Sequence, residues 1–183
     1  MLDLPSIAQE MHDAFKARNM RKMRKINDKI QAETALNFST LNYKLAVYSY
    51  VLGKILSKPR FLGKDHAESI KEIEEKLRGF VSTAKKRDLT AIEKYLDSLK
   101  EAIDALESSD SRFIKGMIDK GKLKTAAILY AQGISLSAAS EMTGVEKQEI
   151  MDYAGKTMMF DRMGEKTPLD SRLKKARRML LGE

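Results

Sequence analysis

Apolar residues recur at steps of three and four along the N-terminal part of the chain, which is the spacing of one face of an α-helix. These stripes predict one long helix or two shorter ones within residues 5–36, and further helices around 41–58, 66–81 and 90–107. The most regular stripe consists of Ile92, Leu96, Leu99, Ile103 and Leu106. Amphipathic helices joined by short turns can bury their stripes only against one another, so residues 4–108 are predicted to form an up-and-down helical bundle.

Proline, glycine and capping residues punctuate this pattern. Pro59 is predicted to end the second of these helical segments, since the residue before a proline is pushed out of the helical region. Asp65, with Glu68 three residues later, has the spacing of a capping box and is predicted to begin the next helix. Beyond the bundle, Gly121 predicts a break between two short helices.

The polar run ESSDSRF, residues 107–113, is the predicted boundary between two domains, because it is small, polar and rich in capping residues. We therefore divide the chain into a helical bundle, residues 1–110, and a second region, residues 111–183. The predicted fold class is all-α, with the bundle followed by a helix-turn-helix and a basic C-terminal helix.

The helix-turn-helix prediction rests on the stretch AILYAQGISLSAASEMTGVEKQEIMDYAGKT. Gly133 is predicted to end one helix and Ser135 to cap the next, as glycine and serine commonly do. Gly144 would then make the turn, with Val145 filling the core beneath it. Ile150 is expected to face inward from the second helix.

Over about residues 122–160, the stretch ILYAQGISLSAASEMTGVEKQEIMDY resembles the helix-turn-helix superfamily. It is similar in particular to the compact helix-turn-helix of short prokaryotic antitoxins. That resemblance implies a protein partner, a PIN-type ribonuclease. The helices before residue 108 are additional to the antitoxin pattern, because such antitoxins are usually much shorter.

The second helix of the predicted motif carries little positive charge. Residues 146–156 contain two lysines and three acidic residues, a net charge of −1, and a helix of that charge is repelled by phosphates. Lys147 and Gln148 are the candidates for contact with base edges.

Positive charge is instead concentrated in two other segments of a chain whose net charge is +8. Residues 16–29 carry a net charge of +6, and the predicted last helix is almost as basic. Either cluster could neutralise several phosphates of DNA or RNA, although runs of charge are more commonly a solvated helix face. The candidate contact residues are Arg18, Arg21, Lys22, Arg24, Lys25, Arg172, Lys174, Lys175, Arg177 and Arg178. The last helix also has an apolar face, which favours docking on a protein partner over binding to a membrane.

The composition and motifs of the chain exclude several kinds of site. The absence of cysteine excludes disulfides and thiolate metal sites and favours a cytoplasmic location. His12 and His66 are the only histidines, and no phosphate-binding glycine loop or nucleophile motif is present. The spaced Arg60 and His66 superficially match all-helical HEPN ribonucleases, but Pro59 and Gly63 predict a turn where those enzymes have a helix.

The sequence therefore predicts a non-enzymatic binding protein with no cofactor and no bound metal. The leading hypothesis is a helix-turn-helix regulator that contacts DNA or RNA mainly through phosphates. The alternative is a protein-interaction module, antitoxin-like or an adaptor, whose helix-turn-helix and C-terminal helix dock on a protein such as a PIN-type ribonuclease. A homodimer remains open under both hypotheses, and neither involves a membrane.

Overall fold

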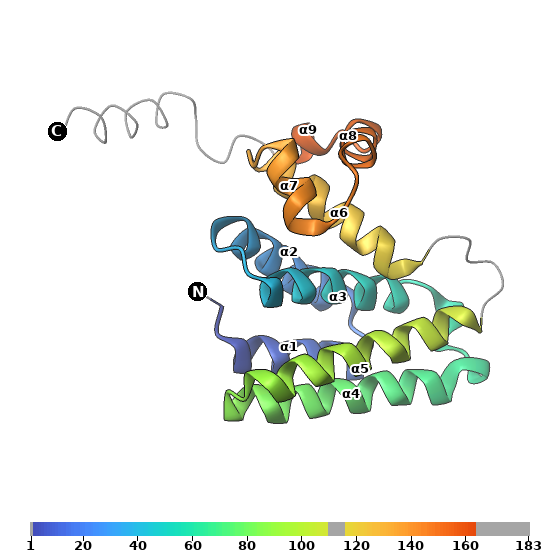
Figure 1. Ribbon diagram of the computed structural model, residues 1–183. Helices are drawn as coiled ribbons and strands as arrows, with labels where there is room; N and C mark the ends of the chain where they lie inside the picture. Colours follow the sequence, from blue (N-terminus) through green and yellow to red (C-terminus); the bar gives the residue numbers. More distant parts are fainter. Residues whose placement is uncertain (1, 110–115, 164–183) are drawn as a thin grey trace.

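A computed structural model describes residues 2–109 and 116–163, and this part of the chain is helical throughout, without a strand (Figure 1). The α-helices are α1 (Leu4–Lys16), α2 (Met20–Leu36), α3 (Thr40–Leu56), α4 (Ala67–Lys86), α5 (Leu89–Ser108), α6 (Met117–Ala131), α7 (Leu136–Thr143), α8 (Lys147–Lys156) and α9 (Met159–Met163). Two 3₁₀ turns, η1 (Pro59–Leu62) and η2 (Lys64–His66), connect α3 to α4. The all-α prediction is confirmed for this part of the chain. None of the helices described is long and apolar enough to cross a lipid bilayer.

The N-terminal segment forms two helices rather than one. Helix α1 ends at Lys16, and Arg18 then adopts a left-handed backbone conformation with φ of +52°. The side chain of Asn19 accepts a hydrogen bond from the backbone N–H of Lys22 at 2.9 Å and so caps the start of α2. This local cap resolves the ambiguity that the apolar pattern leaves open, because the pattern continues across the junction.

Helices α1 to α5 bury their apolar stripes in one large cluster. Helices α4 and α5 run antiparallel to each other, α1 packs on α4, and α2 packs on α3 (Figure 1). Ile92, Leu96, Leu99, Ile103 and Leu106 are fully buried in this cluster, as their periodicity predicts. Helix α3 ends at Leu56, three residues before the proline that was expected to stop it.

The capping prediction at Asp65 is wrong. Asp65 lies within η2, and the residue preceding α4 is His66, whose side chain makes no capping hydrogen bond. The reason lies in the turn itself: Phe61 is fully buried, and its ring meets the His66 ring edge-on with centroids 5.6 Å apart. This packing holds the chain in 3₁₀ turns through residue 66, so α4 starts one residue later than an Asp65 cap requires.

The expected break at Gly121 is also wrong, because α6 runs without interruption through this residue. Gly121 is buried where α6 crosses α3. A Cβ atom at this position would lie 3.1 Å from Val47 Cγ1, 3.2 Å from Val51 Cγ2 and 3.3 Å from the Val47 carbonyl oxygen. The glycine therefore serves the close approach of two helices rather than a bend in one of them.

Contacts between helices also fix where α6 begins. Glu107, near the end of α5, accepts hydrogen bonds from the backbone N–H of Met117 with both carboxylate oxygens, at 2.8 and 2.9 Å. A carboxylate in this position satisfies an otherwise unpaired N–H of the first helical turn and interacts favourably with the helix dipole. Met117 and Ile118 then join the large cluster.

The rest of α6 packs with α7, α8 and α9 around a second, smaller cluster, at the top of the molecule in Figure 1. Several local predictions are confirmed here. Gly133 has φ of +99° and follows α6, with Ile134 N–H donating to Leu129 O at 3.2 Å. Ser135 Oγ accepts from Ala138 N–H, and Gly144 ends α7 with φ of +70°. Val145 and Ile150 are buried in the smaller cluster.

Candidate functional site

The basic residues of α2 form an exposed row. Met23, Ile26 and Ile30 of this helix are buried in the large cluster, which turns the intervening cations toward solvent. The exposed basic side chains among the sequence candidates on α2 are Arg21, Lys22, Arg24 and Lys25. The prediction that residues 16–29 present positive charge at the surface therefore fits the packing of α2.

Arg18 differs from the other candidates because its side chain has structural contacts of its own. Its Nη1 donates to the carbonyl oxygen of Phe15 at 2.9 Å, and its Nη2 lies 3.4 Å from Glu74 Oε2 on α4. The guanidinium also lies over the Phe15 ring, 5.2 Å from its centroid. These contacts connect the α1–α2 junction to α4, so Arg18 is less suited to contact a ligand than its neighbours.

Arg24 reaches a cavity that the sequence does not reveal. A pocket of about 270 Å³ opens between α2, α3 and α6, and Arg24 shares its wall with Lys54 of α3 and Lys124 of α6. We call this cavity the basic pocket. Its lining residues are Arg24, Asn27, Asp28, Ser49, Tyr50, Gly53, Lys54 and Lys124. Three cations from three different helices thus converge on one cavity, with one carboxylate among them.

Buried polar side chains hold these helices together beside the basic pocket. Asn27 Nδ2 donates to Ala46 O and to Ser49 Oγ, both at 2.9 Å, which joins α2 to α3. One turn further along α2, Gln31 Nε2 donates to Thr125 Oγ1 at 2.9 Å, which joins α2 to α6. Asn27 and Gln31 are almost completely buried, and hydrogen bonds in such surroundings are costly to break. The walls of the pocket are therefore set in place before any ligand arrives.

Tyr50 lies between the cations of the pocket. The ammonium group of Lys124 is 4.5 Å from the centroid of the Tyr50 ring, and that of Lys54 is 5.4 Å away, distances at which the electron-rich ring attracts a cation. Burial raises the pKa of the Tyr50 phenol to about 12, and its interaction with Tyr153 of α8 adds to the increase. Tyr50 is therefore an uncharged phenol at neutral pH and does not reduce the positive charge of the pocket.

Helix α8 presents a different surface. Lys147 and Gln148, the predicted contacts to base edges, are both exposed. Gln148 Nε2 donates to Asp152 Oδ1 at 2.8 Å, so this amide is already engaged with a carboxylate on the same face. Neither residue lines the basic pocket. The exposed face of α8 thus presents Lys147 and Gln148 next to acidic side chains.

The second predicted cluster, Arg172, Lys174, Lys175, Arg177 and Arg178, lies outside the described residues. The sequence analysis missed Lys54 and Lys124, because it counted charge along the chain. A convergence of single cations from α3 and α6 leaves no run in the sequence. The usable signal was the helical spacing of Lys54 four residues after Tyr50, which places a cation beside an aromatic ring.

Residues 2–109 and 116–163 contain no group of three or more histidine, aspartate or glutamate side chains placed to hold a metal ion. Comparisons with protein-family models, with curated proteins and with solved structures find no match to this chain. The basic pocket and the exposed row on α2 are therefore the features on which a functional proposal has to be based.

Proposed function

We propose that this chain is a non-enzymatic binding protein that contacts nucleic acid mainly through its phosphates. In this proposal α1 to α5 form a helical bundle, and α7 and α8, joined at Gly144, form a helix-turn-helix carried on α6. The observation that carries the proposal is the convergence of Arg24, Lys54 and Lys124 on one pocket beside the exposed cations of α2.

The distribution of charge supports contact through α2 rather than through α8. Cations that neutralise phosphates release condensed counterions, and this term dominates sequence-independent binding to nucleic acids. The α2 row and the basic pocket supply such cations from adjacent elements, whereas residues 146–156 have a net charge of −1. Lys147 and Gln148 would then add secondary contacts to a complex that α2 holds.

A salt titration with duplex DNA and structured RNA tests this proposal. The double variant Arg21→Gln/Lys25→Gln removes two exposed cations of α2 without altering the pocket lining. We expect weaker binding at low salt and, on duplex DNA, a slope of log affinity against log salt that is smaller by up to about 2, since each lost phosphate contact lowers the slope by about 0.9.

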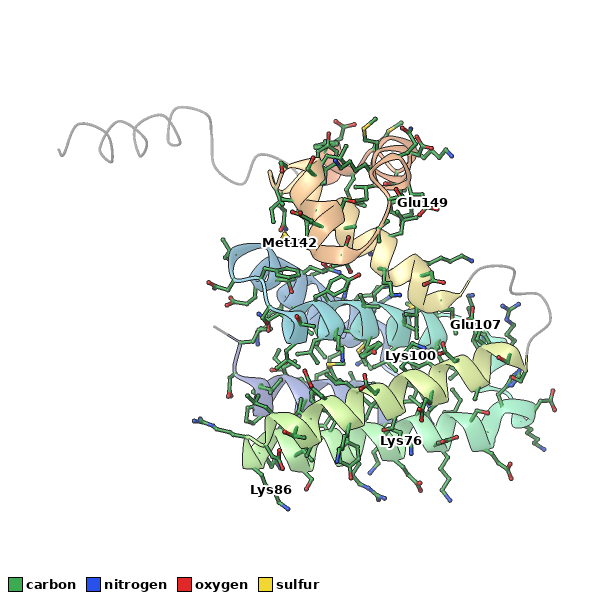
Figure 2. All side chains as sticks on the ribbon, viewed as in Figure 1. Lys76, Lys86, Lys100, Glu107, Met142 and Glu149 are labelled. Carbon is green, nitrogen blue, oxygen red and sulfur yellow. The ribbon has the colours of Figure 1, made fainter. Side chains whose placement is uncertain are left out.

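The matched control is Lys71→Gln/Lys86→Gln on α4, where both side chains are exposed and neither lines the basic pocket; Lys86 lies at the lower edge of the molecule in Figure 2. This control carries the same change in net charge and should bind like the unmodified protein. Absence of measurable binding at about 50 mM salt would refute the proposal, as would equal losses in the two double variants.

A second candidate function is docking on a protein. Met151, Met158 and Phe160 are exposed by 44%, 67% and 50%, which places large apolar side chains on α8, between α8 and α9, and on α9. The Phe160 ring packs edge-on against Tyr130 with centroids 5.1 Å apart, so it is held at the surface. Exposed apolar groups of this kind favour an interface with a protein, and the antitoxin resemblance suggests a PIN-type ribonuclease.

Co-purification with a PIN-type ribonuclease is the measurement for this candidate. We expect the variant Met158→Ser/Phe160→Ser to lose such a complex while it retains binding to nucleic acid. A ribonuclease complex that survives this double substitution, or a chain that self-associates through the same residues in sedimentation experiments, would count against docking of a ribonuclease at this surface.

A further inference from the structure

The basic pocket differs from the α2 row in geometry, and this difference bears on the kind of phosphate that each can bind. The row lies on the exposed side of one helix, so its cations face outward and can contact neighbouring phosphates of a strand. In the pocket, Arg24, Lys54 and Lys124 approach one cavity from three helices. Converging donors suit a single compact group with several oxygens, and arginine adds a planar fork that can bind two of them.

The charge of the pocket points to a dianion. Its lining contains three cations and one carboxylate, Asp28, which leaves a net charge of +2. A phosphodiester carries one negative charge, whereas a phosphomonoester carries about −1.5 to −2 at neutral pH. Electrostatic attraction to a fixed set of charges grows with the charge of the ligand, so a dianion gains more from this lining than a monoanion does.

We propose that the basic pocket binds a phosphomonoester in preference to a phosphodiester. The group would be the 5′-terminal phosphate of a nucleic acid strand or the phosphate of a free mononucleotide, which share the same chemistry. This inference rests on the proposed function in assuming a nucleic-acid or nucleotide ligand. The inference adds that the protein distinguishes the 5′ end of a nucleic acid strand from its interior.

The pocket is prepared for such a ligand. The hydrogen bonds of Asn27 and Gln31 fix α2 against α3 and α6, so the three cations are not brought together by the ligand. Lys124 lies over the Tyr50 ring, which limits the freedom of its side chain and reduces the entropy lost on binding. The volume of about 270 Å³ is enough for a phosphate together with part of a sugar and too small for several nucleotides.

The test compares three single-stranded oligonucleotides of identical sequence that end in a 5′-hydroxyl, a 5′-phosphate or a 5′-methyl phosphate. The methyl phosphate retains the phosphorus group but carries one charge fewer. We expect the 5′-phosphate strand to bind about tenfold more tightly than the other two. Equal affinity for all three strands overturns this inference and leaves the proposed function intact, because binding of the 5′-hydroxyl strand alone tests contact with the backbone.

Competition with adenosine monophosphate separates the two sources of the phosphate. If the mononucleotide displaces the 5′-phosphate strand, the pocket accepts a free nucleotide. If the 5′-phosphate preference persists while the mononucleotide does not compete, the pocket requires the end of a strand. Both results support a phosphomonoester site, and adenosine without phosphate serves as the negative control.

Substitutions assign the preference to the pocket. We expect Arg24→Gln and Lys124→Gln each to reduce the tenfold preference for the 5′-phosphate strand to less than about threefold, and to weaken the 5′-hydroxyl strand no more than Arg21→Gln does. Arg21→Gln, on α2 outside the pocket lining, should weaken all three strands equally. Asp28→Asn raises the net charge of the lining to +3 and should strengthen binding of the 5′-phosphate strand most. A preference that survives in both Arg24→Gln and Lys124→Gln overturns the assignment.

Discussion

Single residues account for the places where helices meet most closely. Gly121 of α6 and Gly53 of α3 are both buried glycines inside helices, yet their surroundings differ. A Cβ at Gly121 would crowd two valines and a carbonyl oxygen, whereas a Cβ at Gly53 would make one ordinary contact, 3.6 Å from Met23 Cγ. The two positions therefore separate a helical glycine that a close helix contact requires from one whose site has room for a methyl group.

Substitution by alanine should have opposite effects at these two glycines. Alanine is favoured over glycine in a helix interior by about 1 kcal/mol, so Gly53→Ala should raise the free energy of unfolding by up to that amount. At Gly121 the same gain is outweighed by overpacking, which costs about 1–3 kcal/mol. The added methyl group would crowd two valine side chains, which are stiff, and a backbone oxygen, which cannot move without its helix. We expect Gly121→Ala to be destabilising by about 1 kcal/mol.

Urea unfolding of the two variants measures both changes directly. Gly53→Ala serves as the control for the intrinsic preference of the helix. A rise in stability for Gly121→Ala as large as that for Gly53→Ala would mean that the α3–α6 contact can relax, and the close approach would then have no energetic role.

Sequence periodicity was most informative at the scale of single helices. It located α3, α4 and α5 and their buried faces, because an amphipathic stripe is a local property of the chain. It failed at Asp65 and Gly121, where the outcome depends on the burial of Phe61 and on the side chains of α3. The basic pocket could not be predicted for the same reason, because Arg24, Lys54 and Lys124 meet only after three helices have packed.

The cluster formed by α6 to α9 should open independently of the larger one. Four of its eight buried side chains are alanines, namely Ala126, Ala127, Ala139 and Ala154, so it buries little apolar surface for each residue that it orders. Elements with few buried contacts open at lower free energy than the whole molecule. We expect the backbone amides of α7 and α8 to exchange with deuterium well before those of α4 and α5.

Two core truncations test this order of opening by hydrogen exchange. Ile150→Ala removes a fully buried side chain from the smaller cluster, at a cost of about 2–4 kcal/mol, and should speed exchange in α7 and α8 alone. Leu96→Ala makes a similar change in the large cluster and should speed exchange in every helix. If Ile150→Ala speeds exchange equally in α4 and α5, the described helices unfold as one unit.

At the scale of the whole molecule, α6 connects the two apolar clusters. Its first residues, Met117 and Ile118, are buried with α1 to α5, whereas Ala126 and Ala127 are buried with α7 to α9. The hydrogen bond from Tyr43 Oη to the Thr143 carbonyl oxygen, at 3.1 Å, adds a direct link between α3 and α7. Lys124 of the basic pocket belongs to α6, so its position depends on how α6 is held between the two clusters.

The carboxylate of Glu107 ties the start of α6 directly to the end of α5. A connection whose ends are aligned by another contact can change in length at small entropic cost. Related chains could therefore acquire insertions between Ser109 and Gly116 in the course of evolution. An epitope or a fluorescent protein could be spliced in at the same place without displacing Lys124.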